Sequence, residues 1–325
     1  MSNASVTFTG AQNAADTTMT EQRALFLKVF SGEVITAFEE FSVVLDKHSV
    51  RTIKAGKSAQ FPVIGQMPAA EYHTPGAEIL GQDVPKSERI IPVDKLLISH
   101  VFIDDLDDAM SHFDVRSKYS RMMGQRLSLT FDRNVMRNII LAGREASAVV
   151  TGGDKGERIE DANLNSGTEA TFLAAWVDAL YDAATKLDEK FVLGKRWCVL
   201  KPADYYGLVK AVASNGFSVI HRDYGGEGSF ADGKVLKIAG IELIPAPTLP
   251  TDDSESDEFH GVDAATTKGI VFTEDAVGTV KLMDLSLQTQ WDIRRQGTLM
   301  VARYAMGHGM LQSECVVELA SGAVT

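Results

Sequence analysis

The sequence of 325 residues predicts an α+β protein, on three observations. Residues 114–144 contain no proline and carry an apolar side chain at every fourth position, which is the period of a helix. Residues 48–103 contain strand-like arms around a loop, and five of the nine prolines fall within 62–92. From residue 278 onward the pattern is that of strands alone, whereas helix and strand patterns mix between the long helix and this last region.

The long helix is predicted to begin at Asp114, because its carboxylate can accept the unpaired backbone N–H groups of a first turn. Gly143 is the predicted stop. A helix of about 29 residues is a rod of roughly 43 Å, which crosses a whole domain. Other elements must therefore lie along it. Gly124 in its interior costs only ~1 kcal/mol.

The N-terminal region divides into a tail and a docking segment. Residues 1–20 are rich in small polar residues and are expected to be poorly ordered. Residues 21–41 predict one helix, or two short helices broken at Gly32. Their apolar face is wide, so we expect it to dock on another surface.

Residues 48–103 predict a projecting hairpin. Strands are expected at 48–53 and 61–64 going out, and at 89–93 and 96–103 coming back. The segment between them is rich in proline and glycine and cannot bury much of itself. Long loops without their own core are usually functional or disordered. Because strand-like arms flank this one, we expect its exposed face to meet another molecule.

The remaining elements follow from shorter patterns. A short helix is predicted within 103–112 and a glycine-rich loop after Gly143. Two further helices are predicted at 169–190 and 202–212. The predicted strands are 196–200, a pair within 234–245 that turns at Ala239-Gly240, 269–272, 279–293, 298–306 and 314–319, with a break or bulge at 307–309.

Composition excludes several functional classes. The net charge of −12, from 44 acidic and 32 basic residues, argues against a broad grip on nucleic acid, which needs a basic surface. The first twenty residues lack the basic and apolar regions of a secretory signal, and no apolar run approaches the roughly 18 residues of a membrane span. The two cysteines, Cys198 and Cys315, are expected to be reduced core residues.

The motifs that could carry chemistry are incomplete, so we expect no catalytic residue, no metal and no cofactor. Gly56-Lys57-Ser58 lacks the first glycine of a phosphate-binding loop, because position 51 is arginine. The string GKSAQ ends in Gln60, where a nucleophile elbow needs glycine. The seven histidines do not show a metal-ligand spacing.

Two alternatives remain. Asp104, Asp105, Asp107 and Asp108 could hold a divalent metal, but neighbouring side chains point to different faces, and acids favour a helix start. His308 lies between two glycines, and a hydrolase could use it together with one of these acids. A backbone break in a long strand explains those glycines as well.

Five strings of the chain resemble one known family. They are ALFLKVFSGEVITAF (24–38), GKSAQFPVIG (56–65), DAMSHFDVRSKYS (108–120), AVGTVKLMDLSL (276–287) and ARYAMGHGM (302–310). They are collinear with the major capsid proteins of T-seven-like short-tailed bacteriophages. The match is dense over about 24–143 and 272–312. The end departs from the family pattern, because Gln312-Ser313-Glu314-Cys315 stands where Arg-Pro-Glu-Ala is common.

The resemblance implies the Hong Kong-phage-like capsid shell fold, shared by tailed phages and herpesviruses, and a structural, non-enzymatic role. It implies an N-terminal arm (1–47), an extended loop (48–100), a peripheral domain (101–145 and 286–325) with a spine helix (114–143), and an axial domain (146–285). Members form hexamers and pentamers of an icosahedral head. They assemble in the host cytoplasm on a scaffolding protein, and double-stranded DNA enters the virion through a portal at one vertex.

For contacts between subunits, the residues we expect are Lys57, Phe61, Tyr72 and Arg89 in the hairpin and Phe26, Val29 and Phe38 in the arm. Arginines off the apolar stripe of the long helix, such as Arg116, Arg126, Arg133 and Arg137, are expected to face the shell interior or a neighbour. An encapsulin-like compartment shell on the same fold is the alternative function.

Overall fold

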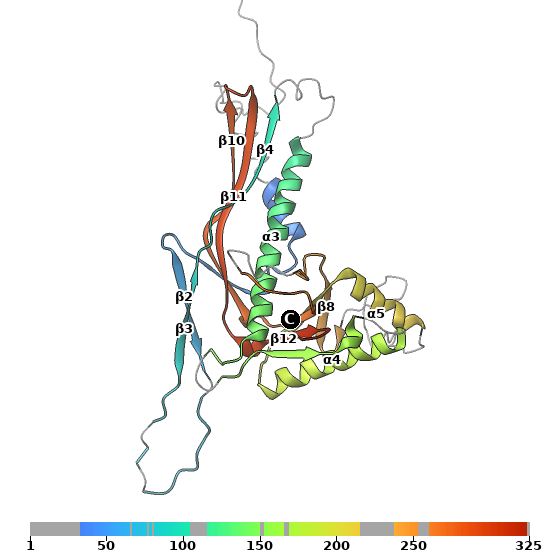
Figure 1. Cartoon of the computed structure of the whole chain (residues 1–325). Helices are drawn as coiled ribbons and strands as arrows, with labels where there is room; N and C mark the ends of the chain where they lie inside the picture. Colours follow the sequence, from blue (N-terminus) through green and yellow to red (C-terminus); the bar gives the residue numbers. More distant parts are fainter. Residues whose placement is uncertain are drawn as a thin grey trace, which may run out of the picture. The chain divides into compact units, whose positions relative to one another are not determined.

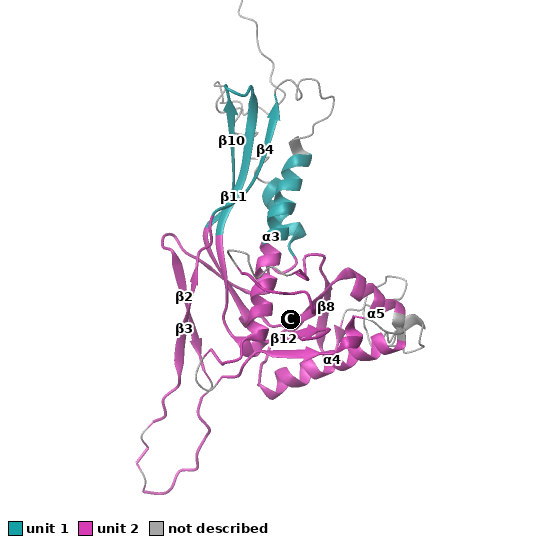
Figure 2. Ribbon diagram, viewed as in Figure 1, with its two compact units in different colours: residues 1–42, 96–130, 283–305 teal, residues 43–95, 131–282, 306–325 magenta. Residues whose placement is uncertain are grey.

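A computed structural model describes residues 33–65, 67–76, 78–79, 81–104, 116–149, 153–165, 169–214, 237–252 and 260–323 (Figure 1). The chain divides into two compact units (Figure 2). Unit 1 contains residues 1–42, 96–130 and 283–305, and unit 2 contains 43–95, 131–282 and 306–325.

Three long elements contribute residues to both units. The helix α3 (Arg116–Arg144) has 29 residues, which confirms the predicted long helix. The strands β10 (Val277–Asp292) and β11 (Gly297–Met310) form the predicted final hairpin. Asp114, the predicted N-cap, and the short helix predicted within 103–112 fall largely outside the described residues, since 105–115 are not described.

Unit 1 contains the first half of α3, the helical residues 33–41, the strand β4 (Leu97–Asp104) and parts of β10 and β11. The strand β4 pairs antiparallel with β11 from Gly297↔Asp104 to Tyr304↔Leu97. Residues 33–41 are helical and lie against α3, where a side chain at Gly124 would come within 2.5 Å of the Val34 carbonyl oxygen. Gly124 therefore allows two helical backbones to approach closely, a role that its cost in helix propensity did not reveal.

Unit 2 is built on a mixed six-stranded sheet with the order β5-β12-β9-β6-β8-β7. Its central strands are almost fully buried. The last strand of the chain pairs parallel with β5 and antiparallel with β9. The strands are β5 (Glu157–Glu160), β6 (Trp197–Leu200), β7 (Lys237–Ile238), β8 (Ile241–Pro245), β9 (Thr267–Phe272) and β12 (Val316–Ala320).

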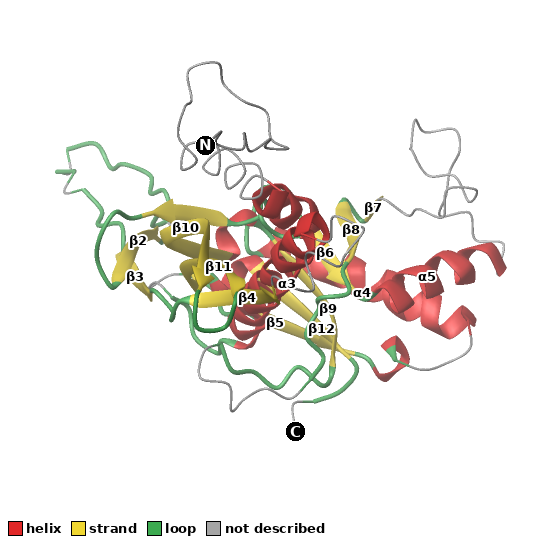
Figure 3. Cartoon of the chain, turned by 90° about the horizontal axis from the view of Figure 1, so that it is seen from above, coloured by secondary structure: helices red, strands yellow, loops and turns green. Residues whose placement is uncertain are grey.

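Helix α4 (Glu169–Glu189) contacts β12, β5 and β7 of this sheet, and α5 (Pro202–Ser214) packs beside α4 (Figure 3). The indole ring of Trp176 lies 3.4 Å from the position a Cβ would take at Gly269, so α4 packs directly on β9. The predicted helices and the turn at Ala239-Gly240 are confirmed. The strand β5 was missed, because its charged sequence ERIE follows a glycine-rich segment and is stabilised by pairing with the distant β12.

The buried carboxylate of Glu318 connects α3 to this sheet. Arg144, at the end of α3, donates to both of its oxygens at 2.8 and 2.7 Å, and the Thr267 hydroxyl donates at 2.6 Å. Arg158 lies 3.6 Å from the same carboxylate. A buried charge needs such partners, so this cluster orients the helix end and the final strand together. Arg137, expected on an outward face, is buried instead, with its Nη2 4.0 Å from Asp252.

A second hairpin, of β2 (Ser58–Ile64) and β3 (Lys86–Pro92), is held at its base by glycines of the final hairpin. A Cβ at Gly307 would lie 1.9 Å from the Pro92 carbonyl oxygen, and one at Gly309 would lie 2.9 Å from Ile91. The expected break at 307–309 is wrong, because β11 continues to Met310. Gly307 and Gly309 allow β3 to approach β11 closely, because they have no side chain.

Three buried polar side chains, those of His48, Thr279 and His308, form a hydrogen-bonded network in the same unit. His48 Nδ1 contacts the Val44 carbonyl at 2.7 Å and must donate, so its Nε2 accepts from the Thr279 hydroxyl at 2.8 Å. The hydroxyl oxygen in turn accepts from His308 Nδ1 at 2.9 Å. Burial lowers the pKa of His48 to about 4, and burial together with the charges of His260 and His48 lowers the pKa of His308 well below its ordinary value. Both rings are therefore neutral in the folded chain at pH 7.

We predict that Gly307→Ala destabilises the chain by about 3 kcal/mol, because the new methyl group would overlap the backbone of Pro92 and one of the two strands must move. Gly322→Ala is the matched control, since nothing lies within 4 Å of its Cβ position. Urea unfolding of the two variants measures the difference, and equal free energies would contradict the close contact.

We also predict that the free energy of unfolding falls between pH 6.5 and 4. The unfolded chain binds a proton on His48 near pH 6.5, whereas the folded chain binds it only near pH 4. This stability is fully present above pH 6.5, and its loss from His48 alone is on the order of 3 kcal/mol. Urea unfolding at pH 7.5, 6 and 4.5 measures it. His48→Gln should reduce this loss without removing it, because burial also keeps His308 neutral in the folded chain, and replacement of the exposed His100 is the control.

Candidate subunit interface

The hairpin of β2 and β3 has one face toward its own unit and one toward solvent. Its register runs from Ser58↔Pro92 to Ile64↔Lys86. On the inner face, Ala59 and Ile91 form a buried cluster with Val280 of β10 and with Leu311. This cluster anchors the hairpin, so its outer face stands on a fixed base.

The outer face alternates polar and apolar side chains. Gln60 pairs with Ile90, Pro62 with Glu88, and Ile64 with Lys86. Ile64 is 62% exposed and Ile90 is 56% exposed. Apolar side chains at this exposure on a two-stranded sheet have no covering element within the described part of the chain.

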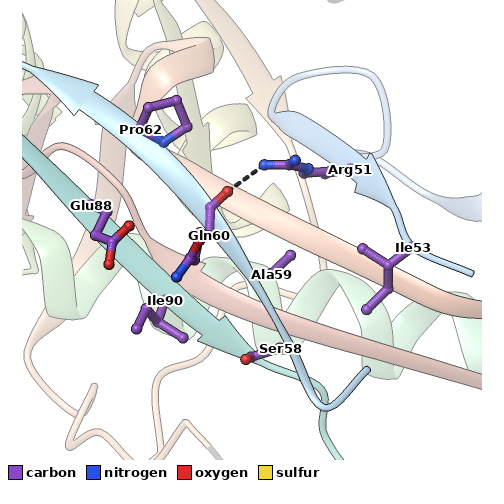
Figure 4. A pocket seen from close by; sticks show the side chains of 8 residues that line it. All are labelled: Arg51, Ile53, Ser58, Ala59, Gln60, Pro62, Glu88 and Ile90. Atoms are coloured by element: carbon purple, nitrogen blue, oxygen red, sulfur yellow. Dashed lines mark hydrogen bonds between the residues drawn. The ribbon is translucent and has the colours of Figure 1, made fainter. Parts of the chain in front are cut away.

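A groove of about 530 Å³ lies along this face. In Figure 4, Ser58, Gln60 and Pro62 follow one another along β2, while Glu88 and Ile90 come from β3. The opposite side is formed by Ile53 and by Arg51, from β1 (Ser49–Thr52), whose guanidinium donates to the Gln60 carbonyl. The groove combines an apolar floor with one cation and one anion, a composition that suits another protein surface.

Beyond the paired strands, the tip forms a long loop that leaves its own sheet (Figure 1). Every described residue from 67 to 83 is exposed, and Tyr72 is 104% exposed. Met67 and Ile79 are also strongly exposed. Residues 65–85 contain three acids, Glu71, Glu78 and Asp83, and neither lysine nor arginine. The tip thus offers apolar and acidic side chains without a core of its own.

The structure places the expected contact residues in different environments. Lys57 and Tyr72 are exposed, while Phe61 and Arg89 form a half-buried cross-strand pair on the inner face. Phe38 is 4% exposed and packs edge-on against Tyr304 in unit 1, so it has little surface to offer a neighbour. Phe26 and Val29 lie outside the described residues.

Sequence reasoning missed the exposed apolar residues Met67, Ile79, Ile64 and Ile90. A signal was available for the first two, since apolar side chains in a proline- and glycine-rich loop have nothing local to pack against. Ile64 and Ile90 could not be found without the register, because a shift of one residue would have turned them inward.

The alternatives for catalysis or metal binding do not form a site among the described residues. His308 is buried and its Nδ1 is used by Thr279. Of the acidic cluster, Asp104 is described and exposed, while Asp105, Asp107 and Asp108 lie outside the described residues. No three described acids, histidines or cysteines are grouped as metal ligands, and no described helix is both long and apolar enough to cross a membrane.

Known proteins are similar to this chain in both sequence and fold. The chain is 32% identical to the major capsid protein of Enterobacteria phage T3, over 96% of this chain and 93% of that protein. It is also 32% identical to the major capsid protein of Escherichia phage T7, over 94% of this chain and 92% of that protein. The capsid structure of cyanophage P-SCSP1u superposes with a TM-score of 0.75 at 36% identity, over 87% of this chain and 89% of that one.

The family model of Gp10A-like major capsid proteins matches residues 60–320, which include the hairpin, α3, the six-stranded sheet and the final strands. The fold is accordingly the Hong Kong-phage-like capsid shell fold, and the role is structural rather than enzymatic. The chain belongs to the Gp10A-like family of phage major capsid proteins.

Proposed function

We propose that copies of this chain form the hexamers and pentamers of an icosahedral phage head that encloses double-stranded DNA. The observation that carries the proposal is the hairpin, whose tip from residue 67 to 83 is exposed at every described position. An anchored, extended loop with apolar side chains and no core gains its stabilisation from a neighbour.

A shell must be strong in total and weak in each contact, because subunits have to correct their positions during assembly. Contacts of about 800 Å² per partner suffice when each copy makes several of them at once. A long loop adds contact area without enlarging the hydrophobic core. Lys57, Phe61, Tyr72 and Arg89 remain our proposed contact residues of the hairpin, together with Phe26, Val29 and Phe38 of the arm.

The proposed domain assignment follows the family architecture. Residues 1–47 would be the arm, 48–100 the extended loop, 101–145 with 286–325 the peripheral domain, and 146–285 the axial domain. The sheet pairing adds that β12, from the last segment, is a strand of the same sheet as β5, β6, β8 and β9.

For partners, we propose a scaffolding protein, a portal at one vertex and packaged DNA, with assembly in the host cytoplasm before the chain becomes part of the virion. The net charge of −12 supports a wall that confines DNA without binding its phosphates. The relatives at 32% and 36% identity are phage capsid proteins, which favours the phage head over an encapsulin-like compartment shell.

We predict that replacing residues 67–83 by a short Asn-Gly turn abolishes particle formation and leaves the fold intact. The hydrogen bond from Gly65 N to the Pro85 carbonyl, at 2.9 Å, closes the strands below the cut. Circular dichroism and thermal unfolding report the fold, and electron microscopy reports particles.

The control for this deletion keeps the length of the loop and replaces residues 67–83 by a flexible Gly/Ser linker. If the side chains carry the contact, this variant also fails to assemble. Normal particles from both variants would show that the hairpin tip is not a subunit contact.

We further predict that the purified chain binds duplex DNA more weakly than a Kd of about 10⁻⁴ M at physiological salt, the weak limit of non-specific binders. Fluorescence anisotropy with labelled duplex measures this affinity. Tight binding with a steep salt dependence would contradict the proposed passive wall.

A further inference from the structure

The turn that follows α4 displays two apolar side chains on a tightly held backbone. Phe191 is 79% exposed and Leu193 is 86% exposed, whereas Val192 between them is buried. We call residues 190–195 the knob. It belongs to unit 2, and it lies outside the hairpin that forms the proposed interface.

The knob ends the helix with a Schellman motif. The Val192 N–H donates to the Leu187 carbonyl and the Phe191 N–H to the Asp188 carbonyl, both at 3.0 Å. Val192 and Leu187 stand at the two positions whose apolar side chains accompany this motif, and both are buried. Phe191 occupies the position of this motif that takes a left-handed backbone conformation.

Phe191 has a φ of 56°, where glycine or asparagine is the ordinary choice. A bulky residue in this conformation crowds its Cβ against the backbone and destabilises the fold. Its ring cannot offset that cost by packing in the chain, because most of it is exposed. Backbone strain that no packing offsets among the described residues points to a contact made elsewhere.

Contacts of two side chains, Arg196 and Lys190, hold the knob in place. Arg196 Nη2 donates to Asp188 Oδ1 at 2.5 Å and to the Val192 carbonyl at 2.9 Å. Lys190 Nζ donates to the Lys155 carbonyl at 2.7 Å and lies 3.3 Å from Glu157. The apolar pair is therefore pre-organised, and a partner that binds it loses little conformational entropy.

The structure assigns the knob as an anchor that inserts into a neighbouring copy of this chain, in a contact separate from that of the hairpin. This inference rests on the proposed assembly into a shell. The character of the partner follows from the side chains. Two apolar groups suit a desolvated protein pocket, and the nearby charges of Asp188, Glu189 and Lys195 suit a polar rim.

A second copy is favoured over another protein for two reasons. Copies of the same chain surround each subunit of a capsid, and rings of copies require heterologous contacts, in which a protrusion on one copy meets a different surface on the next. In addition, a buried aromatic side chain covers about 150–250 Å², far less than the roughly 800 Å² of a stable contact. The knob can act only as part of a wider interface, such as a shell provides.

The test compares Phe191→Gly and Phe191→Asn with the wild type in full-length chain. Either residue accepts the left-handed backbone, so the Tm of the unassembled chain should rise by about 2 °C or more. Particle formation should require at least about tenfold more protein, as expected for the loss of an interface anchor. Leu193→Ser should weaken assembly with an unchanged Tm.

Ala239→Gly is the matched control. Ala239 also has a positive φ, of 51°, but it carries no large apolar side chain. It should raise the Tm and leave assembly unchanged. A photo-crosslinking phenylalanine analogue at position 191 should join two copies within assembled particles.

A fall in Tm for both Phe191 variants would show that the ring stabilises its own fold and would overturn the inference. So would normal assembly of both variants, or cross-links that reach only a different protein. If the wild type formed no particles with its scaffolding protein, the proposed function would fail and the knob with it. Normal wild-type particles with unimpaired Phe191 variants would overturn the knob alone.

Discussion

The close approach of two backbones at Gly307 is the constraint on which the outward-facing part of this chain depends. With no side chain there, β11 admits the Pro92 carbonyl of the hairpin, and Gly309 and Gly278 give the same clearance to Ile91. The small cluster of Ala59, Ile91, Val280 and Leu311 completes the seat. Because the base is fixed by packing, the rest of the hairpin can remain free of its own core and still be presented in one orientation.

Buried polar groups give the same region its specificity. The bond directions in the chain from Val44 through His48 and Thr279 to His308 assign one tautomer to each ring, and apolar packing alone would not select a unique arrangement. At the C-terminal end of α3, the buried carboxylate of Glu318 likewise selects one arrangement of its partners Arg144 and Arg158. These clusters join segments that are distant in the chain, so each depends on the complete fold of its unit. The cost is sensitivity to protonation, which the neutral histidines introduce.

On the proposed function, two kinds of surface serve assembly by different physical means. The hairpin is long, exposed and anchored only at its base, which suits contact over a large area. The turn at Phe191 is short and held by hydrogen bonds, and it combines an exposed ring with an unfavourable backbone conformation. A shell can use both, since wide contacts supply total stability whereas rigid anchors set the position of one copy against the next.

The sequence by itself determined the elements whose signal is local. The period of four predicted α3, alternation predicted the final hairpin, and prolines without nearby apolar partners predicted a projecting loop. Only the tertiary structure decided what depends on distant partners: that β5 is a strand because β12 lies beside it, that Gly307 marks a contact and not a break, and that Arg137 is buried beside Asp252. The physical reason is range. The period of a helix or a strand is visible within a short stretch of sequence. The close contact between Pro92 and Gly307 instead joins residues more than 200 positions apart.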